Sequence, residues 1–502
     1  MGQGVDVDSS GGTRGHSDPD AGPPGTHPIV LMLAALPAVL IGLGLRAWSM
    51  RTPLLPLNAD EAVTGLQSYE VLHGHFRLVV AGNQYGATSE SYLFAPLLAV
   101  WSGPIPLRIG SILLSAVAAW TIYLLGREFF TRAVSLTLAL IGWTMSGAVV
   151  VLWTRPYMGY TTGFIAEVVA LVAATRAMNA DGRRLGRLGL IAGVGTGLAL
   201  WSHPMFGIVS MLMLLAPTVR HVRDLLHWWL PAAGGFVLGI APWLLFIARN
   251  GLPGGPGFDS TYSERLVNFF ADLLPRLLGV RAPDGGWPYG AVIGVLFLAA
   301  VLASMVVGYV ALVRRCGPKI APALTAAVLT FPVLSAMSAF TFHQDARYGM
   351  AYIPPLLVGL GGLSLLATRR VQQSAALVAV VPTVWALALC VPVIHYQVGF
   401  TFTNPDQGAE EATAVLERAG VTDLGGEYWA TYLVDYLADG RFDVRPDVAV
   451  RFNDDAARFD ASTPTDRTYI YTTGIEPHLA LPPDDYQLVQ VGGYDIYLPD
   501  AG

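Results

Sequence analysis

Two adjacent carboxylates follow the first long apolar run of the chain. Asp60 and Glu61 lie in the segment Asn58 to Gly65, which begins an amphipathic stretch. A carboxylate here could act as a general base that takes a proton from an acceptor hydroxyl, if partial burial fixes its position and keeps its pKa useful. A structural role is also open, because Asn58 or Asp60 would cap a helix and Glu61 would favour its positive end.

A polar and aromatic cluster follows between Gln84 and Tyr92. It contains Tyr85 and a third carboxylate, Glu90. Tyrosine and tryptophan are common at membrane interfaces, where they act as anchors. The cluster therefore leaves open whether Glu90 reaches a site shared with Asp60.

Two arginines directly abut the ends of apolar runs, namely Arg155 and Arg347. A guanidinium stays charged and can grip two phosphate oxygens at once, so both arginines are candidates for binding an anionic headgroup. The alternative is an interface side chain that only extends toward water. Arg347 shares its short loop with further candidates for the site, and these are His343, Asp345 and Tyr348.

A divalent metal ion is a candidate cofactor, and His343 together with Glu61 or Glu90 could act as its ligands. Metal sites usually show ligand pairs at fixed spacing, such as His-x3-His, and the outer loops contain no such pair. His203, in Trp201-Ser202-His203-Pro204, lies at another helix end and fits a structural role better.

The elements that must position these residues are membrane spans. Of the 502 residues 53% are apolar and 13% are charged, and no single globular core could bury that much apolar surface. A spanning helix needs about 20 mostly apolar residues, and about eleven such runs are found. They lie near 29–48, 105–126, 133–152, 158–175, 188–202, 204–219, 228–247, 291–313, 320–341, 349–367 and 374–394.

The arginines predict how these spans are oriented, because short cytoplasmic loops carry an excess of Lys and Arg. With the N-terminus inside, every predicted cytoplasmic loop is basic. The residues concerned are Arg127, Arg132, Arg176, Arg183, Arg184, Arg187, Arg220, Arg223, Arg314, Arg315, Lys319, Arg369 and Arg370. Counting Tyr92 to Trp101 as a further span would place most of these outside, so this stretch is predicted to lie along the outer interface.

The spans are flanked by two different kinds of segment. Residues 1–27 are Gly, Ser, Asp and Pro with almost nothing apolar, and we expect a disordered cytoplasmic tail. Residues 28–395 form the membrane domain, whose outer loop 50–102 carries the candidate carboxylates. Residues 396–502 are predicted to form an acidic, soluble, extracytoplasmic α/β domain with helices at 407–419 and 430–437, a strand at 468–472 and a hairpin at 486–498 that turns at Gly492-Gly493. From His395 onward, 19 Asp and Glu stand against 6 Arg, so nucleic acid is not an expected partner.

In this order the features resemble the GT-C class of membrane glycosyltransferases, in particular protein O-mannosyltransferases and lipid A aminoarabinose transferases (glycosyltransferase family 39-like). The resemblance covers most of the membrane region. It depends on Asp60-Glu61 in a long outer loop after the first span, a basic turn after the second span, and Arg347-Tyr348 leading into Ile353-Pro354-Pro355-Leu356. Glu427 to Tyr432 looks like the tail of some bacterial members, whereas Arg155 departs from members that carry an acidic residue there.

This resemblance implies a polytopic α-helical GT-C fold in the cytoplasmic (inner) membrane. It implies that Asp60 is the catalytic base, that Glu61 is its neighbouring site carboxylate and that Arg347 engages the donor phosphate. The expected partners are the bilayer, a polyprenyl-phosphate sugar donor and an envelope glycan, lipid or protein acceptor, with transfer by inversion on the outer side. The alternatives are a transporter or flippase for lipid-linked sugars and a scaffold that acts through the acidic domain. Glu167 is the single acidic residue within the predicted spans and no repeated halves are seen, which disfavours a transporter.

Overall fold

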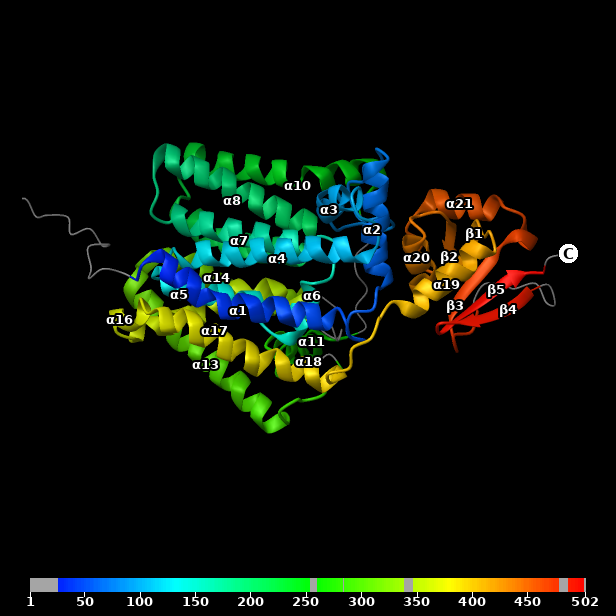
Figure 1. Cartoon of the computed structure of the whole chain (residues 1–502). Helices are drawn as coiled ribbons and strands as arrows, with labels where there is room; N and C mark the ends of the chain where they lie inside the picture. The colour runs from blue at the N-terminus through cyan, green and yellow to red at the C-terminus, as the bar shows by residue number, and fades with distance from the viewer. Residues whose placement is uncertain (1–25, 253–259, 283, 338–345, 478–485, 501–502) are drawn as a thin grey trace, which may run out of the picture.

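The computed structural model describes residues 26–252, 260–282, 284–337, 346–477 and 486–500. A bundle of long, roughly aligned helices makes up most of the molecule, and a small domain with a sheet lies beyond one end of it (Figure 1). Two helices, α2 (Ala59–Leu72) and α3 (Ser89–Leu98), lie at that end of the bundle, between it and the small domain.

Over the described residues, each of the eleven apolar runs coincides with one helix or with consecutive helical segments. The helices of these runs are α1 (Pro28–Ser49), α4 (Pro104–Gly126), α5 (Arg132–Thr144), α6 (Gly147–Leu152), α7 (Tyr160–Ala177), α8 (Gly182–Ser202), α9 (Pro204–Arg220), α10 (Leu230–Asn250), α13 (Ala291–Cys316), α14 (Ala321–Met337), α15 (Ile353–Gly362), α17 (Ala375–Leu389) and α18 (Val391–Val398). The remaining short helices of this region are α11 (Tyr262–Asn268), α12 (Leu274–Leu277) and α16 (Arg369–Gln372).

Seven helical segments of the described chain are long and apolar enough to cross a membrane. One of them, Ala291–Ala336, contains both α13 and α14, and its 46 residues are long enough for two crossings. The run predicted at 133–152 is broken into α5 and α6, because the hydroxyl of Ser146 accepts a hydrogen bond from the Val149 amide and starts a new helix. The chain is a polytopic helical membrane protein.

The basic loops meet at the end of the bundle opposite the small domain. The carboxylate of Glu128 contacts Arg176 Nε at 2.7 Å and Lys319 Nζ at 3.0 Å, which joins three of these loops. The N-terminal side of α1 reaches the same end, where the Thr26 hydroxyl donates to the Gln373 carbonyl at 2.6 Å. Positive charge is therefore gathered at one end of the bundle.

Helix α3 covers the stretch expected at the outer interface. It has 10 residues, about half the length that a spanning helix needs. It packs on α2 and α4 through Phe94, which also fills the space beside Gly110. The structure therefore agrees with the expectation that this segment does not cross the membrane.

The small C-terminal domain is a five-stranded sheet with helices. Strand order is β2-β1-β3-β5-β4, with β1, β2 and β3 parallel and β4 and β5 antiparallel to their neighbours. Its elements are α19 (Gln407–Arg418), β1 (Asp423–Gly426), α20 (Tyr428–Leu437), β2 (Asp443–Pro446), α21 (Asn453–Ala461), β3 (Thr468–Thr472), β4 (Tyr486–Val491) and β5 (Tyr494–Pro499). The predicted helices, strand and hairpin are confirmed, whereas β1, β2 and α21 were not predicted.

The C-terminal domain and the end of the bundle share one hydrophobic core. Helix α20 packs along α2, and buried side chains from both helices belong to the same cluster. Tyr436 lies against Gly65, where a Cβ would come within 2.2 Å of its ring, and its hydroxyl donates to the Gly103 carbonyl at 2.6 Å. This seam fixes the C-terminal domain over the first turns of α2, where the two candidate carboxylates lie.

Candidate active site

The first turn of α2 directs its two carboxylates to different surroundings. Asn58 is the N-cap, and its side-chain oxygen accepts the amide of Glu61 at 2.9 Å. Adjacent residues on a helix lie about 100° apart around its axis. Glu61 consequently enters the end of the bundle, while Asp60 faces the C-terminal domain.

Glu61 is fully buried between two arginines. Its oxygens lie 3.4 Å from Arg108 Nε and 3.3 Å from Arg155 Nε, and Arg108 also lies 3.5 Å from Asp406. Burial raises the pKa of Glu61, and the two guanidinium groups oppose that shift. Both arginines also donate to backbone carbonyls at 2.9 Å, Arg108 to Leu55 and Arg155 to Leu54, and Arg155 Nη1 donates to the Tyr157 hydroxyl at 3.2 Å. This cluster ties the loop before α2 to helix α4 and to the segment that precedes α7.

Asp60 lies at a more open position, in contact with a third arginine. Its Oδ2 is 3.5 Å from Arg347 Nη1, and the two side chains are 14% and 20% exposed. Its Oδ1 accepts a hydrogen bond of 3.3 Å from the hydroxyl of Tyr428, the first residue of α20. Residues from the start, the late part and the end of the chain therefore meet at one carboxylate.

The guanidinium of Arg347 is surrounded by aromatic rings. Its carbon lies 4.9 Å from the ring centre of Tyr157, 5.6 Å from that of Tyr160 and 5.1 Å from that of Tyr348. Such contacts attract the cation to the ring faces and restrict its orientation. Arg347 belongs to the 3-10 helical segment Ala346–Tyr352, which leads directly into α15.

A cavity of about 460 Å³ opens beside Asp60. The membrane domain contributes Asp60 to the lining of this cavity, and the C-terminal domain contributes the other lining residues. The lining residues of that domain are Glu427, Tyr428, Trp429, Asp447, Val448, Ala449, Arg451 and Ile475. A partly exposed carboxylate that faces a cavity and touches a cation is suited to proton transfer next to an anionic group.

Structural comparison identifies the fold. ArnT from Cupriavidus metallidurans aligns with a TM-score of 0.61 in the apo state, at 13% identity over 93% of this chain and 97% of ArnT. Its structure with bound undecaprenyl phosphate aligns with a TM-score of 0.62, at 13% identity over 94% and 98% of the two chains. The chain has the GT-C fold. The oligosaccharyltransferase AglB from Archaeoglobus fulgidus aligns with a TM-score of 0.48, at 14% identity over 83% of this chain and 64% of AglB. No protein-family model and no curated protein matches the sequence.

Within this GT-C fold, Glu90 has its hydrogen-bond partners at the start of α7. Its Oε1 accepts the amides of Thr161 at 3.1 Å and Thr162 at 3.3 Å, at the start of α7. Burial raises the pKa of Glu90 to about 7, and the amide hydrogen bonds oppose that shift. Glu90 therefore joins α3 to the N-terminus of α7.

Tyr85 lies at the edge of the aromatic group around Arg347. Burial raises its pKa, and the positive charges of Arg347 and Arg451 oppose this, so its hydroxyl lies within the field of both. Its ring contacts that of His203 at 5.6 Å between centres, and His203 in turn contacts Tyr348 at 6.4 Å. Tyr348 thus contacts Arg347 and Tyr85 lies near both arginines, whereas the site candidates His343 and Asp345 lie outside the described residues.

The carboxylates of this GT-C site are poor metal ligands. Glu61 is occupied by two guanidinium groups, and Asp60 contacts one more. No group of three or more His, Cys, Asp or Glu among the described residues is placed to hold a metal ion. The described part of the site therefore does not fit a divalent metal ion.

Four residues of this site were not recognised as such from the sequence. Arg108 lies within an apolar run, where an ionisable residue is itself a signal of a functional or positioning role. Asp406 and Arg451 carry no local signal, because distant segments bring them to the site. Tyr428 lies in the segment Glu427 to Tyr432, for which the resemblance to bacterial family members implied no function.

Proposed function

We propose that this protein is a membrane glycosyltransferase that moves a sugar from a polyprenyl-phosphate donor to an acceptor hydroxyl. The observation that carries the proposal is the contact between Asp60 and Arg347 beside the cavity at the end of a GT-C bundle. In such a reaction the base and the phosphate-binding cation lie on either side of the anomeric carbon. Asp60 and Arg347 are neighbours, and their 3.5 Å contact would give way to the sugar when the donor binds between them.

On the donor side, Arg347 would bind the phosphate. Its guanidinium is partly exposed and is oriented by three tyrosines, so it can grip two phosphate oxygens. The ArnT structure with undecaprenyl phosphate makes a polyprenyl-phosphate lipid a reasonable ligand for the shared fold. Arg155 was also a phosphate candidate, but its contacts with Glu61 and the Leu54 carbonyl favour a positioning role.

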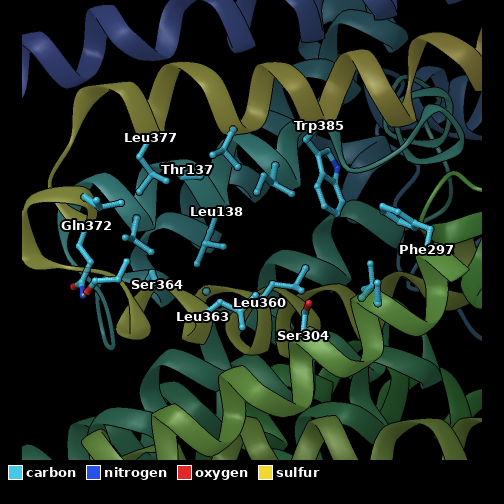
Figure 2. A pocket seen from close by; sticks show the side chains of 18 residues that line it. Thr137, Leu138, Phe297, Ser304, Leu360, Leu363, Ser364, Gln372, Leu377 and Trp385 are labelled. Carbon is cyan, nitrogen blue, oxygen red and sulfur yellow. The ribbon is translucent and has the colours of Figure 1, made fainter.

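The isoprenoid tail would follow α15 into the bilayer. Arg347 lies just before α15, and the far part of that helix lines an apolar groove of about 490 Å³ with α5, α13 and α17. Figure 2 shows Leu138, Leu377 and Trp385 directed into this groove. Polar groups are few in its lining, as an aliphatic chain requires.

On the acceptor side, Asp60 would act as the general base. It takes the proton from the acceptor hydroxyl while the new bond forms at the anomeric carbon and the bond to the donor phosphate breaks. Polyprenyl phosphate leaves with the bonding electrons, and the configuration inverts. The hydrogen bond from the Tyr428 hydroxyl would hold the carboxylate ready for this step.

The site would open to the outer side of the cytoplasmic membrane. The basic loops gather at the opposite end, around Glu128, and short basic loops favour the cytoplasm. The N-terminus would then be cytoplasmic and the C-terminal domain extracytoplasmic. A lipid-linked donor suits this orientation because nucleotide sugars are made in the cytosol.

The test compares Asp60→Asn with Glu411→Gln, an exposed carboxylate of α19. Purified proteins are incubated with radiolabelled polyprenyl-phosphate sugars and envelope acceptors. Loss of the base should lower the transfer rate about 10²- to 10⁴-fold, with donor binding kept and the control unchanged. Unchanged transfer by Asp60→Asn would reject this mechanism, and lipid-linked sugar movement without any transfer would favour the flippase.

A further inference from the structure

The wall of the cavity that faces Asp60 carries an exposed tryptophan. Trp429 is the second residue of α20 and is 50% exposed, although it lines the cavity. Its ring stands edge-on to Tyr428, with 5.0 Å between the ring centres and 88° between the planes. This contact restrains the indole at the position next to the residue that hydrogen-bonds Asp60.

Two carboxylates of the same wall are held by hydrogen bonds from strand β3. Glu427 Oε2 accepts the amide of Thr472 at 2.8 Å, and Asp447 Oδ1 accepts the hydroxyl of Tyr471 at 3.3 Å. A carboxylate has several acceptor positions, so Glu427 can still receive hydrogen bonds from a ligand. With Asp60, the cavity has three carboxylates against the single guanidinium of Arg451.

The loop that carries Asp447 is fixed to the membrane domain. Arg451 hydrogen-bonds Asn83, and its Nε donates to the Tyr428 hydroxyl at 3.2 Å. Gly82 touches this loop so closely that a Cβ would lie 2.4 Å from the Val450 carbonyl oxygen. Ala449, in the lining, adopts a left-handed φ of 54°, a strained conformation that persists where the surroundings impose it. The lining is therefore a built and restrained surface.

We infer that this cavity binds a neutral carbohydrate chain as the acceptor, with one sugar ring on the face of Trp429 and its hydroxyls donating to Glu427. An apolar ring face beside fixed hydrogen-bond acceptors matches the two kinds of surface of a sugar. The excess of carboxylates disfavours anionic acceptors, and bound in this way the chain extends a hydroxyl toward Asp60. This inference rests on the proposed function, whose acceptor class it specifies.

The test measures binding by saturation-transfer NMR, using full-length protein in nanodiscs. The probes are neutral gluco-, manno- and arabino-oligosaccharides, an oligogalacturonate as the acidic chain, and a Ser/Thr-rich peptide. At least one neutral chain should bind, and Trp429→Ala should weaken it about tenfold or more, with part of the affinity kept in Trp429→Phe. Leu488→Ala, a change at an exposed apolar residue of β4, should leave binding unchanged.

The outcomes separate this inference from the proposed function. Asp60→Asn should keep glycan binding while it loses transfer. If neutral glycans bind through Trp429 but no donor sugar is ever transferred, the proposed function fails and the carbohydrate site stands. Transfer whose acceptor KM does not change in Trp429→Ala would overturn the inference alone, as would tighter binding of the acidic chain or the peptide.

Discussion

Loss of charge should affect different properties at the two neighbouring carboxylates of α2, namely folding stability at Glu61 and sugar transfer at Asp60. Glu61→Gln keeps the size of the side chain and one oxygen acceptor, but it leaves Arg108 and Arg155 without the charge that they share. Breaking a buried ion pair by changing one partner costs about 3–5 kcal/mol. Asp406 remains 3.5 Å from Arg108, which places the expected loss of folding free energy near the lower end, about 3 kcal/mol.

Asp60→Asn removes a contact of a different kind. The Asp60–Arg347 distance is 3.5 Å and Asp60 borders a cavity, so water can replace part of the lost interaction. Solvent-exposed pairs contribute about 0–1 kcal/mol and broken buried pairs cost about 3–5 kcal/mol, so the loss at this intermediate position should be smaller than that of Glu61→Gln. We therefore expect Asp60→Asn to lose transfer with the smaller loss of stability, and Glu61→Gln to lose stability first.

The assay is unfolding of purified variants in one detergent, followed by tryptophan fluorescence. The double variant Glu61→Gln/Arg155→Gln serves as the control, because removing both charges of a buried pair should restore part of the lost stability. A Glu61→Gln variant no less stable than Asp60→Asn would refute the distinction between the two carboxylates. Losses of the two single variants that simply add in the double variant would refute it as well.

Three further predictions concern single side chains around the site. Arg347→Lys should raise the KM for the lipid donor about tenfold or more in transfer kinetics, because an ammonium cannot bind two phosphate oxygens as a guanidinium does. Burial raises the pKa of Glu90 from about 4.5 to about 7. The stability contributed by the protonated carboxyl group is therefore complete below pH 4.5 and is lost as the pH rises through 7. The melting temperature should fall more between pH 6 and pH 8 in the wild type than in Glu90→Gln. Gly82→Ala should raise the KM for the acceptor more than it lowers kcat. The backbone φ is +67° at Gly82, and the new Cβ would displace the loop at Val450. An unchanged acceptor KM would contradict the proposed role of that loop.

The elements with strong local signals were predictable from the sequence. Long apolar runs gave the helices of the bundle, and alternation around Gly492-Gly493 gave the hairpin of β4 and β5. Strand β1 was missed because its sequence, Asp-Leu-Gly-Gly, has low strand propensity. It forms because β2 and β3 pair with it on both sides, which is information from the tertiary structure.

The site was predictable only in part, for the same reason. The resemblance singled out Asp60, Glu61 and Arg347, and the structure brings Asp60 and Arg347 into contact. The resemblance could not distinguish the surroundings of Asp60 from those of Glu61, because the surroundings depend on the direction in which α2 lies against α4 and α20. The partners Arg108, Asp406 and Arg451 are contributed by segments whose contacts no local pattern encodes.

The packing of α20 on α2 also determines when the cavity beside Asp60 is completed during synthesis of the protein. Asp60 leaves the ribosome early, while Tyr428, Trp429 and Arg451 are made later, and in the proposed orientation they would have to cross the membrane before they could dock. A nascent or truncated chain therefore has the carboxylate and the apolar groove but lacks the opposite wall of the cavity. If the proposed function and orientation hold, maturation of the site would be coupled to export of the C-terminal domain, and unfinished molecules would not consume the donor lipid.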